Sequence, residues 1–266
     1  MAEAGWRIED VDDVRLLRCE ALEAIPGLAH AFSTRIADGR SDFDLGPAEG
    51  ETPDVRTRRR RFVRAAGFGA REPAILRQVH GSVVVEGVQG WPRPPAADGV
   101  FQMAPCGEEV PVPAVRTADC VAVLVADRRA SAWAAVHAGW RGAAGSIGAG
   151  AVTRFMTAGI PPADLVVACG PAILGCCYEV GDEVVEALAS ACGAPSAYTS
   201  RAPSGRTTVD LHAALRAQFA AAGVPAGAIH SAPYCTRCRN DLFFSFRAEG
   251  EASGRLIAAI GPAAGP

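Results

Sequence analysis

The stretch VPAVRTADCVAVLVADRRASAWAAVHA, residues 112–138, decides the fold of this chain. It holds two apolar runs rich in β-branched residues, 112–126 and 131–138, which a short polar segment joins. Apolar runs of this length on either side of a polar turn are typical of two antiparallel, buried strands. We therefore predict a β-sheet core in which these two runs are neighbouring strands.

Three candidate metal ligands stand in or at the ends of such apolar runs. They are His80 in RQVHGS, Cys120 in RTADCVAVLVAD and His137 in AAVHAGWRG. Each one alone has an ordinary interpretation, as a polar residue at a strand end or as a core cysteine. Together, two imidazoles and one thiolate form a zinc ligand set, and three protein ligands leave the fourth tetrahedral position to water or substrate. Structural zinc sites are usually closed by four protein ligands, so a three-ligand site would be catalytic.

Working outward, the same patterns predict strands and helices along the rest of the chain. Strands are expected at 27–34, at 74–87 as a strand or hairpin, at 165–169, near 229, at 243–246 and at 256–260, and helices at 52–66, 142–158, 180–191 and 211–222. Thr52 and Pro53 suit the N-cap and the first helical position. Asp98-Gly99 is a turn signal before another strand. Without regular alternation of strands and helices, the pattern favours a single α/β (α+β) domain, 1–266, with a mixed sheet.

Five strings of the chain resemble one known family. They are RQVHGSVV, TADCVAVLVAD, VHAGWRGAAGSI, GPAILGCCYEVG and CTRCRNDLFFSFRAEGEASGRLIAAIG. The family is that of the bacterial polyphenol oxidases, or laccase-like proteins, and the resemblance covers a core of about residues 29–261. It implies a layered α/β/β/α sandwich. It also carries His80, Cys120 and His137 as the metal ligands and catalytic residues.

The resemblance further implies an activity. Family members are regarded as zinc-dependent purine nucleoside phosphorylases that act on adenosine, inosine and S-methyl-5'-thioadenosine and also deaminate adenosine. Some are called peptidoglycan editing factors. The expected cofactor is therefore Zn²⁺, with Cu²⁺ as the alternative ion, and the expected partners are purine nucleosides and phosphate.

Three arginines are candidate phosphate ligands. Arg35 ends the string FSTR and Arg247 ends FFSFR, so both follow apolar runs, where an arginine must be paired or face a pocket. Arg141 leads from the run that holds His137 into a predicted helix, where it could bind phosphate or cap the turn. Arginine suits phosphate because its planar guanidinium donates two parallel hydrogen bonds. We expect these arginines to face the metal across a nucleoside-sized pocket.

Two other functions use the same residues. The family's older name suggests a copper polyphenol oxidase, but multicopper oxidation needs many imidazole ligands, and the chain has only five histidines and no His-x-His pair. A metal-free hydrolase would use Cys120 as the nucleophile and His137 or His80 as its base, and a peptidoglycan editing role would belong with it. Metal analysis separates this hydrolase from the zinc enzyme.

The other cysteines and one acidic residue receive structural interpretations. Cys176 and Cys177 are expected in a tight turn between a strand and a helix. Cys235 and Cys238 form a single CxxC, and without a second CxxC no zinc ribbon is predicted, so they are assigned to core and turn. Asp119 is expected to point away from the Cys120 side chain and to serve the fold or a histidine.

Composition limits the remaining possibilities. The net charge is −3, so no general attraction to nucleic acid or to an anionic membrane is expected. The first twenty residues contain no apolar signal segment, and no apolar run reaches membrane-spanning length. Nine cysteines, an odd number in core-like strings, do not form a pattern typical of secreted disulfide proteins. A cytoplasmic, monomeric protein is expected.

Overall fold

The computed structural model describes residues 5–46, 52–87, 91, 93–107 and 109–265. In the described part, two six-stranded sheets and a small hairpin account for the strands. The first sheet has the order β1 (Trp6–Val11), β2 (Val14–Cys19), β3 (Leu28–Ala37), β14 (Leu256–Pro262), β7 (Val112–Thr117) and β4 (Pro73–Ala74). The second has the order β13 (Ile229–Ser231), β10 (Leu165–Cys169), β8 (Val121–Asp127), β9 (Ala132–Ala138), β6 (Gly99–Met103) and β5 (Val84–Glu86). The hairpin pairs β11 (Thr199–Arg201) with β12 (Thr207–Val209).

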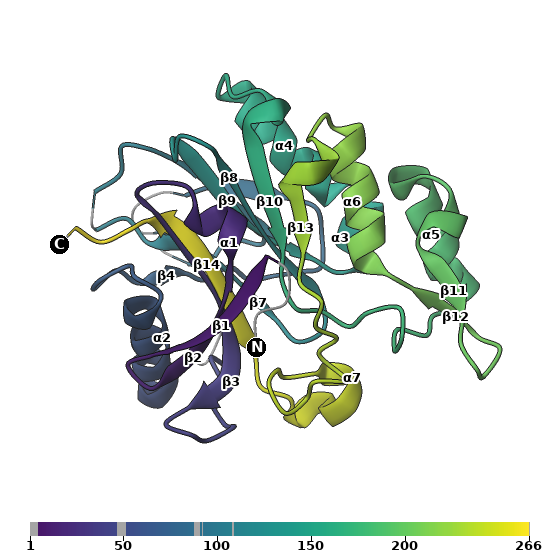
Figure 1. Ribbon diagram of the computed structural model, residues 1–266, viewed down its shortest axis with the longest axis horizontal. Helices are drawn as coiled ribbons and strands as arrows, with labels where there is room; N and C mark the ends of the chain where they lie inside the picture. The colour runs from purple at the N-terminus through teal and green to yellow at the C-terminus, as the bar shows by residue number, and fades with distance from the viewer. Residues whose placement is uncertain (1–4, 47–51, 88–90, 92, 108, 266) are drawn as a thin grey trace.

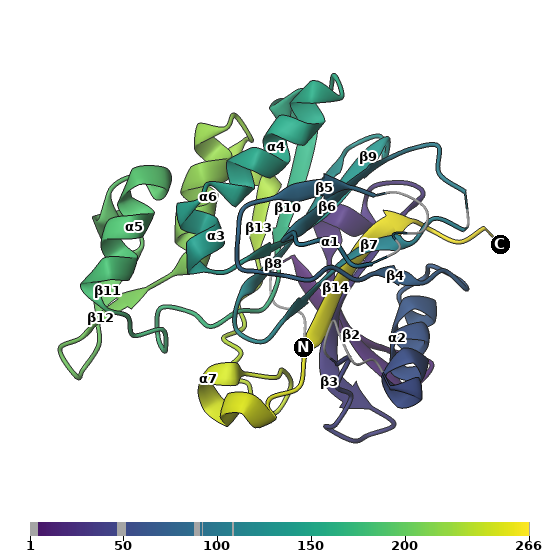
Figure 2. The same ribbon diagram turned by 180° about the vertical axis from the view of Figure 1, so that it is seen from behind.

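Helices cover the outer faces of both sheets. The α-helices are α1 (Glu20–Glu23), α2 (Pro53–Ala65), α3 (Trp140–Ala144), α4 (Ile147–Thr157), α5 (Asp182–Cys192), α6 (Leu211–Ala221) and α7 (Phe246–Glu249), and short 3-10 turns occupy Pro162–Asp164, Pro195–Ala197, Ala226–Ala228 and Gly250–Ala252. Helix α2 packs on the first sheet, and α3 to α6 pack on the second (Figures 1 and 2). This confirms the layered α/β/β/α sandwich with mixed sheets.

Strand β8 shows why the two sheets face each other. Because side chains alternate along a strand, Val123 and Val125 pack against the helices, whereas Leu124 and Ala126 pack against the first sheet. The neighbouring strand β9 alternates in the same way. His137 shares its side of β9 with Trp133, which lies between the sheets. The imidazole therefore lies at the end of the layer between the sheets.

The run 112–126 is divided between the sheets, which corrects the prediction of one continuous strand. β7 pairs with β14 in the first sheet, and β8 pairs with β9 in the second, with Ala122 opposite His137. The antiparallel pairing of β8 with β9 is confirmed. Residues 118–120 cross from one sheet to the other, because Asp119 has a left-handed backbone with φ of 89°. Cys120 is thus held at the place where the two sheets meet.

Three other predictions are corrected, and one hairpin was missed. The strand or hairpin expected at 74–87 is two short strands in different sheets, β4 and β5. The helix expected at 142–158 is two helices, because Ser146 has a left-handed φ of 62°. Residues 243–246 are not a strand: the Ser245 side chain accepts a hydrogen bond from the Ala248 N–H at 3.3 Å and begins α7. The hairpin β1–β2 was not predicted, and its turn lies at Asp12 and Asp13, with φ of 48° and 60°.

Helix α2 begins as predicted. The Thr52 hydroxyl accepts a hydrogen bond from the Val55 N–H at 3.3 Å, and Pro53 is the first helical residue. Among the described residues, no helix is both long enough and apolar enough to cross a membrane.

Candidate active and metal site

His80, Cys120 and His137 come together from three different segments. Their potential ligand atoms all lie within 4.8 Å of one another. The two imidazole rings have centroids 4.9 Å apart and planes at 80°. His137 is only 3 % exposed, whereas His80 is exposed, so the group lies at a surface opening with its inner part buried.

A buried carboxylate, Asp98, positions two of these three residues. Its oxygens accept hydrogen bonds from the backbone N–H groups of Val79, His80 and Gly81 at 3.2, 2.9 and 2.7 Å. The same carboxylate lies 2.9 Å from Nδ1 of His137. A carboxylate at Nδ1 fixes the proton there and leaves Nε2 free to bind a ligand. These contacts also hold His80 in a left-handed conformation, with φ of 58°.

Sequence reasoning missed the role of Asp98 and used the residue only as a turn signal. It lies 39 positions from His137 in the chain, and no local pattern relates the two residues. The one available signal was an acidic residue immediately before an apolar strand, which is common at turns.

The ligand side chains strongly affect each other's protonation. Burial raises the pKa of Cys120, but the attraction of His137 and hydrogen bonds with His137 and His80 outweigh it, leaving that pKa at about 6. Burial lowers the pKa of His137, but the Cys120 thiolate and Asp98 raise it to about 9. Near neutral pH the metal-free protein therefore holds a thiolate beside an imidazolium.

The arrangement fits a zinc ion. Zinc prefers tetrahedral sets of thiolate and imidazole ligands, and these three donors are close enough to share one ion after small movements. There is little room beside them at Gly139, because a Cβ on this residue would stand 3.1 Å from Cys120 Sγ and 3.2 Å from His80 Cδ2. A side chain at this position would crowd two of the three ligands.

The ligands form part of the wall of a pocket of about 440 Å³, a size suited to a small metabolite. The residues that line it are Gln78, His80, Arg116, Thr117, Ala118, Asp119, Cys120, His137, Ile173, Tyr178, Phe246, Arg247 and Arg255.

Burial and the nearby Cys120 raise the pKa of Tyr178 to about 12. Its hydroxyl therefore stays protonated and able to donate at neutral pH.

The predicted phosphate arginines lie in different places. Arg247 lines the pocket, and its guanidinium is 5.3 Å from the Tyr178 ring centre. Arg141 is exposed, stacks on Trp140 at 4.3 Å and is not among the residues that line the pocket.

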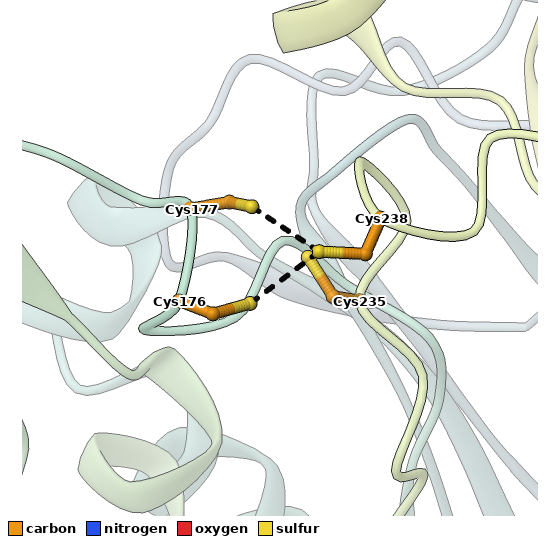
Figure 3. Close-up of side chains that lie close together, drawn as sticks. All are labelled: Cys176, Cys177, Cys235 and Cys238. Carbon is orange, nitrogen blue, oxygen red and sulfur yellow. Dashed lines mark hydrogen bonds between the residues drawn. The ribbon is translucent and has the colours of Figure 1, made fainter.

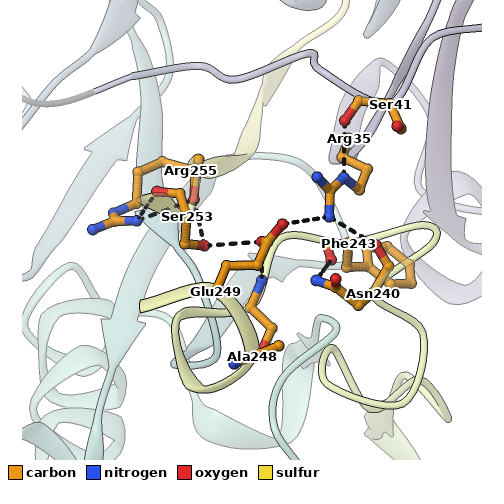
Figure 4. A network of polar contacts seen from close by, with 10 residues as sticks. Arg35, Ser41, Asn240, Phe243, Ala248, Glu249, Ser253 and Arg255 are labelled. Carbon is orange, nitrogen blue, oxygen red and sulfur yellow. Dashed lines mark hydrogen bonds and ion pairs between the residues drawn. The ribbon is translucent and has the colours of Figure 1, made fainter. Parts of the chain in front are cut away.

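Arg35 does not line the pocket, contrary to the expectation that it faces the metal. Its guanidinium forms an ion pair with Glu249 at 3.0 Å and a hydrogen bond to the Asn240 carbonyl at 2.8 Å (Figure 4). It also stacks on the Phe244 ring at 4.3 Å. Arg35 thus connects β3 to the C-terminal loop, and its charge is already neutralised.

Two arginines that sequence reasoning overlooked, Arg116 and Arg255, line the pocket instead. The Arg116 guanidinium donates to the carbonyls of Gly46 and Leu76, but its buried Nε has no hydrogen-bond partner among the described residues. Burial and two nearby arginines lower the Arg116 pKa to about 10. Within the described ranges, no carboxylate forms an ion pair with Arg116, Arg247 or Arg255. Arg116 follows an apolar run just as Arg35 does, so the same signal could have found it.

Asp119 serves the fold, one of the two roles expected for it. Its carboxylate accepts hydrogen bonds from the Thr236 hydroxyl and from the Arg247 backbone N–H, both at 2.6 Å. Its own backbone carbonyl accepts from the Ile173 N–H at 2.9 Å. The residue next to Cys120 therefore connects three segments of the pocket wall.

The assignment of the CxxC to core and turn holds for only part of the motif. Cys235 is buried, but Cys238 is exposed and its sulfur lies 3.4 Å from that of Cys177. The vicinal cysteines and the CxxC, expected to be unrelated, lie against each other. The sequence could not predict this, because about sixty residues separate the two motifs.

Comparisons with known proteins agree with this architecture. The family described as multi-copper polyphenol oxidoreductase laccase matches residues 29–263. The purine nucleoside phosphorylase YlmD of Geobacillus stearothermophilus is 34% identical over 260 residues, which cover 92% of this chain and 93% of YlmD. The adenosine deaminase RL5, from an unknown prokaryotic organism, is 42% identical over 147 residues. That match covers 55% of this chain and spans about half of RL5, 56% of its length.

Solved structures show the same fold. The crystal structure of YlmD from Geobacillus stearothermophilus has a TM-score of 0.80 and 31% identity, with 94% of this chain and 96% of that one covered. The hypothetical protein YfiH of Bacillus licheniformis has a TM-score of 0.83 at 24% identity, with 98% and 100% covered. From the site motifs, the layered fold and the match over residues 29–263, the chain belongs to the multi-copper polyphenol oxidoreductase laccase family.

Proposed function

We propose that this protein is a zinc-dependent purine nucleoside phosphorylase that also deaminates adenosine. The observation that supports it most is one pocket holding both a zinc ligand set, His80, Cys120 and His137, and three arginines without ion-pair partners in the described part of the chain. The relatives named as nucleoside phosphorylases and as an adenosine deaminase support the same substrate class. The proposed substrates are adenosine, inosine and S-methyl-5'-thioadenosine, with phosphate.

Zinc held by these ligands would supply Lewis-acid chemistry, polarising an oxygen or nitrogen placed beside it. The ligands themselves are oriented by the protein, since Asp98 fixes the ring of His137 and the backbone at His80. Orientation of this kind raises metal affinity and holds the reacting atoms in place.

The arginines suit the phosphate half of the reaction. In phosphorolysis, a phosphate oxygen bonds to C1′ of the ribose while the bond from C1′ to the purine nitrogen breaks, so negative charge moves onto the purine. Arg116, Arg247 and Arg255 line the pocket and would hold the anion by charge-assisted hydrogen bonds. The rings of Tyr178 and Phe246 offer flat apolar surfaces for the purine.

The proposal is tested by assaying protein purified without chelator. Ribose 1-phosphate should form from inosine only when phosphate is present, and ammonia should be released from adenosine without phosphate. Absence of both activities from folded, zinc-loaded protein would contradict the proposal.

A cysteine hydrolase is the second candidate, because Cys120, His137 and Asp98 form a nucleophile–base–carboxylate series. Removing zinc with a chelator separates the two functions. The zinc enzyme loses nucleoside turnover and regains it when zinc is restored, whereas a cysteine nucleophile works without metal. The position of His80, a second imidazole that a nucleophile does not need, favours zinc.

Multicopper oxidation has little support from the other histidines. His30 accepts a hydrogen bond from the Cys19 N–H, and His212 contacts the Gly170 carbonyl. In the described ranges, no candidate metal group contains more than two histidines.

The phosphate role is tested with Arg247→Ala, since its guanidinium donates only to the Glu179 carbonyl, at 3.3 Å, among the described contacts. Losing one charge-assisted hydrogen bond should raise the KM for phosphate about tenfold or more. Deamination of adenosine, which uses water, should change much less. Arg201→Ala removes an exposed arginine outside the pocket and is the matched control. Equal loss of both activities in Arg247→Ala would overturn the phosphate assignment.

A further inference from the structure

A second group of possible metal ligands lies outside the pocket lining. The sulfur atoms of Cys176, Cys177, Cys235 and Cys238 all lie within 4.8 Å of one another. Figure 3 shows the four sulfur atoms pointing towards a common centre. Cys176 and Cys177 belong to the loop 170–181, and Cys235 and Cys238 belong to the CxxC. We propose that these four cysteines bind a second, structural zinc ion.

The distances suit this ion. A tetrahedral zinc with bonds of about 2.3 Å to sulfur places its ligand sulfurs about 3.8 Å apart. Cys238 Sγ lies 3.7 Å from Cys176 Sγ and 3.4 Å from Cys177 Sγ. Small side-chain rotations would bring the remaining pairs to the same separation. Four thiolates close the coordination shell, which is the arrangement of structural rather than catalytic zinc.

The backbone around the cluster is already arranged for it. Residues Ala172 and Cys235 form a bridge, in which the Thr236 N–H donates to the Ala172 carbonyl at 2.9 Å. The Leu174 N–H donates to Cys235 Sγ at 3.5 Å. Backbone N–H groups that donate to sulfur stabilise ligating thiolates. Arg237 directly precedes Cys238 in the sequence and would offset part of the negative charge of four thiolates.

A disulfide explains less of the arrangement. Cys238 Sγ is close to two different partners, and a disulfide could use only one of them. Four sulfur atoms gathered from two segments are what one ion requires. None of the pocket ligands contributes to this cluster, so the two sites can be emptied separately.

The second zinc would hold the wall of the pocket. Tyr178, which lines the pocket, directly follows Cys177. Thr236, inside the CxxC, donates its hydroxyl to Asp119 at 2.6 Å, beside the Cys120 ligand. Fixing the two cysteine segments together therefore fixes two parts of the pocket that approach the substrate.

Zinc content distinguishes the two sites. Wild-type protein should hold two zinc ions per chain, Cys238→Ser one, and His80→Ala one. Cys106→Ser, which changes a cysteine outside both groups, should retain two. The melting temperature should fall in Cys238→Ser and not in Cys106→Ser. Cys238→Ser with as much zinc as the wild type would overturn the proposal.

A second measurement uses the wild-type chain and does not depend on a variant that folds. Cys176 and Cys238 are exposed, so free thiols there would be accessible to N-ethylmaleimide. Zinc-bound cysteines should resist the reagent and become reactive after chelation, as peptide mass spectrometry would show. Rapid labelling before chelation would contradict the zinc site, and so would labelling that needs a reductant instead, since that result identifies a disulfide.

Discussion

At the scale of single residues, one side chain outside the candidate ligand set positions two members of that set. Asp98 is completely buried, and it contacts the backbone at His80 and the ring of His137. Hydrogen bonds from His137 and from backbone N–H groups lower the Asp98 pKa, although burial acts against them, and the carboxylate therefore stays charged. A charged acceptor is needed because four donors converge on two oxygens.

We expect Asp98→Asn to weaken zinc binding at the pocket about 10- to 100-fold, because an amide cannot accept all of these hydrogen bonds. Competition with a chromophoric chelator measures this. The matched control is Asp127→Asn. Asp127 is a buried carboxylate at the end of β8 away from Cys120, and it accepts hydrogen bonds from the backbone N–H groups of Ser131 and Ala132. It should lower stability and leave zinc affinity unchanged. Similar zinc affinity in both variants would contradict the role given to Asp98.

The pKa of His30 leads to a prediction about how the stability of the fold depends on pH. Burial, and then the nearby Arg18, lower its pKa from the ordinary 6.5 to about 3. Between these two values the unfolded chain binds a proton that the folded chain does not, so stability falls as the pH falls below 6.5. The loss is up to about 1.4 kcal/mol per pH unit.

His30→Gln keeps an acceptor for the Cys19 N–H and removes this titration. Urea unfolding of both proteins from pH 8 to pH 4 should give curves that converge as the pH falls, because the variant loses less stability. Parallel curves would show that His30 does not contribute in this way.

Some site residues were predictable and others were not, for a physical reason. His80, Cys120 and His137 each end or interrupt an apolar run, so local sequence identifies them as candidates. Arg35 was placed in the pocket because its ion-pair partner, Glu249, is 214 positions away and invisible to local patterns. Residues whose role depends on a distant partner are not determined by their neighbours in the chain.

At the scale of elements, two turns and strand β9, which carries His137, position the candidate site. The crossing at residues 118–120 brings Cys120 between the sheets, and Gly139 joins β9 to α3 beside two ligands. Apolar runs and capping predicted β8, β9 and α2, since those signals are local. The β1–β2 hairpin escaped prediction because its charged residues pair across the strands, as Arg15 and Asp10 do, in place of an alternating apolar face.

Gly139→Ala tests the tight turn. Its φ of −76° suits alanine, so the fold should survive, but the new Cβ would stand 3.1 Å from Cys120 Sγ. We expect weaker zinc binding at the pocket with a nearly unchanged melting temperature, measured by chelator competition and calorimetry. Gly227→Ala adds a methyl group to open space and is the control. If the two variants bind zinc equally well, the turn does not confine the ligands.

At the scale of the whole molecule, local sequence patterns could not predict the order of the layers. β7 and β8 are consecutive in the chain but belong to different sheets, and only three residues separate them. Hydrophobic periodicity indicates which face of a strand is buried. In a sandwich both faces of a strand are covered, so the periodicity does not indicate which layer covers which face. The arginines of the pocket come from β7, α7 and the segment before β14.

The central claim is that Cys120 holds a zinc ion on which nucleoside turnover depends. The most direct measurement is the zinc content of Cys120→Ala together with its phosphorolysis of inosine and its deamination of adenosine. Removing a small side chain at this opening should cost little stability, whereas losing the thiolate removes the one anionic ligand. The account predicts a folded protein with one zinc ion fewer than wild type and neither activity. A variant that keeps its zinc and both activities would contradict it.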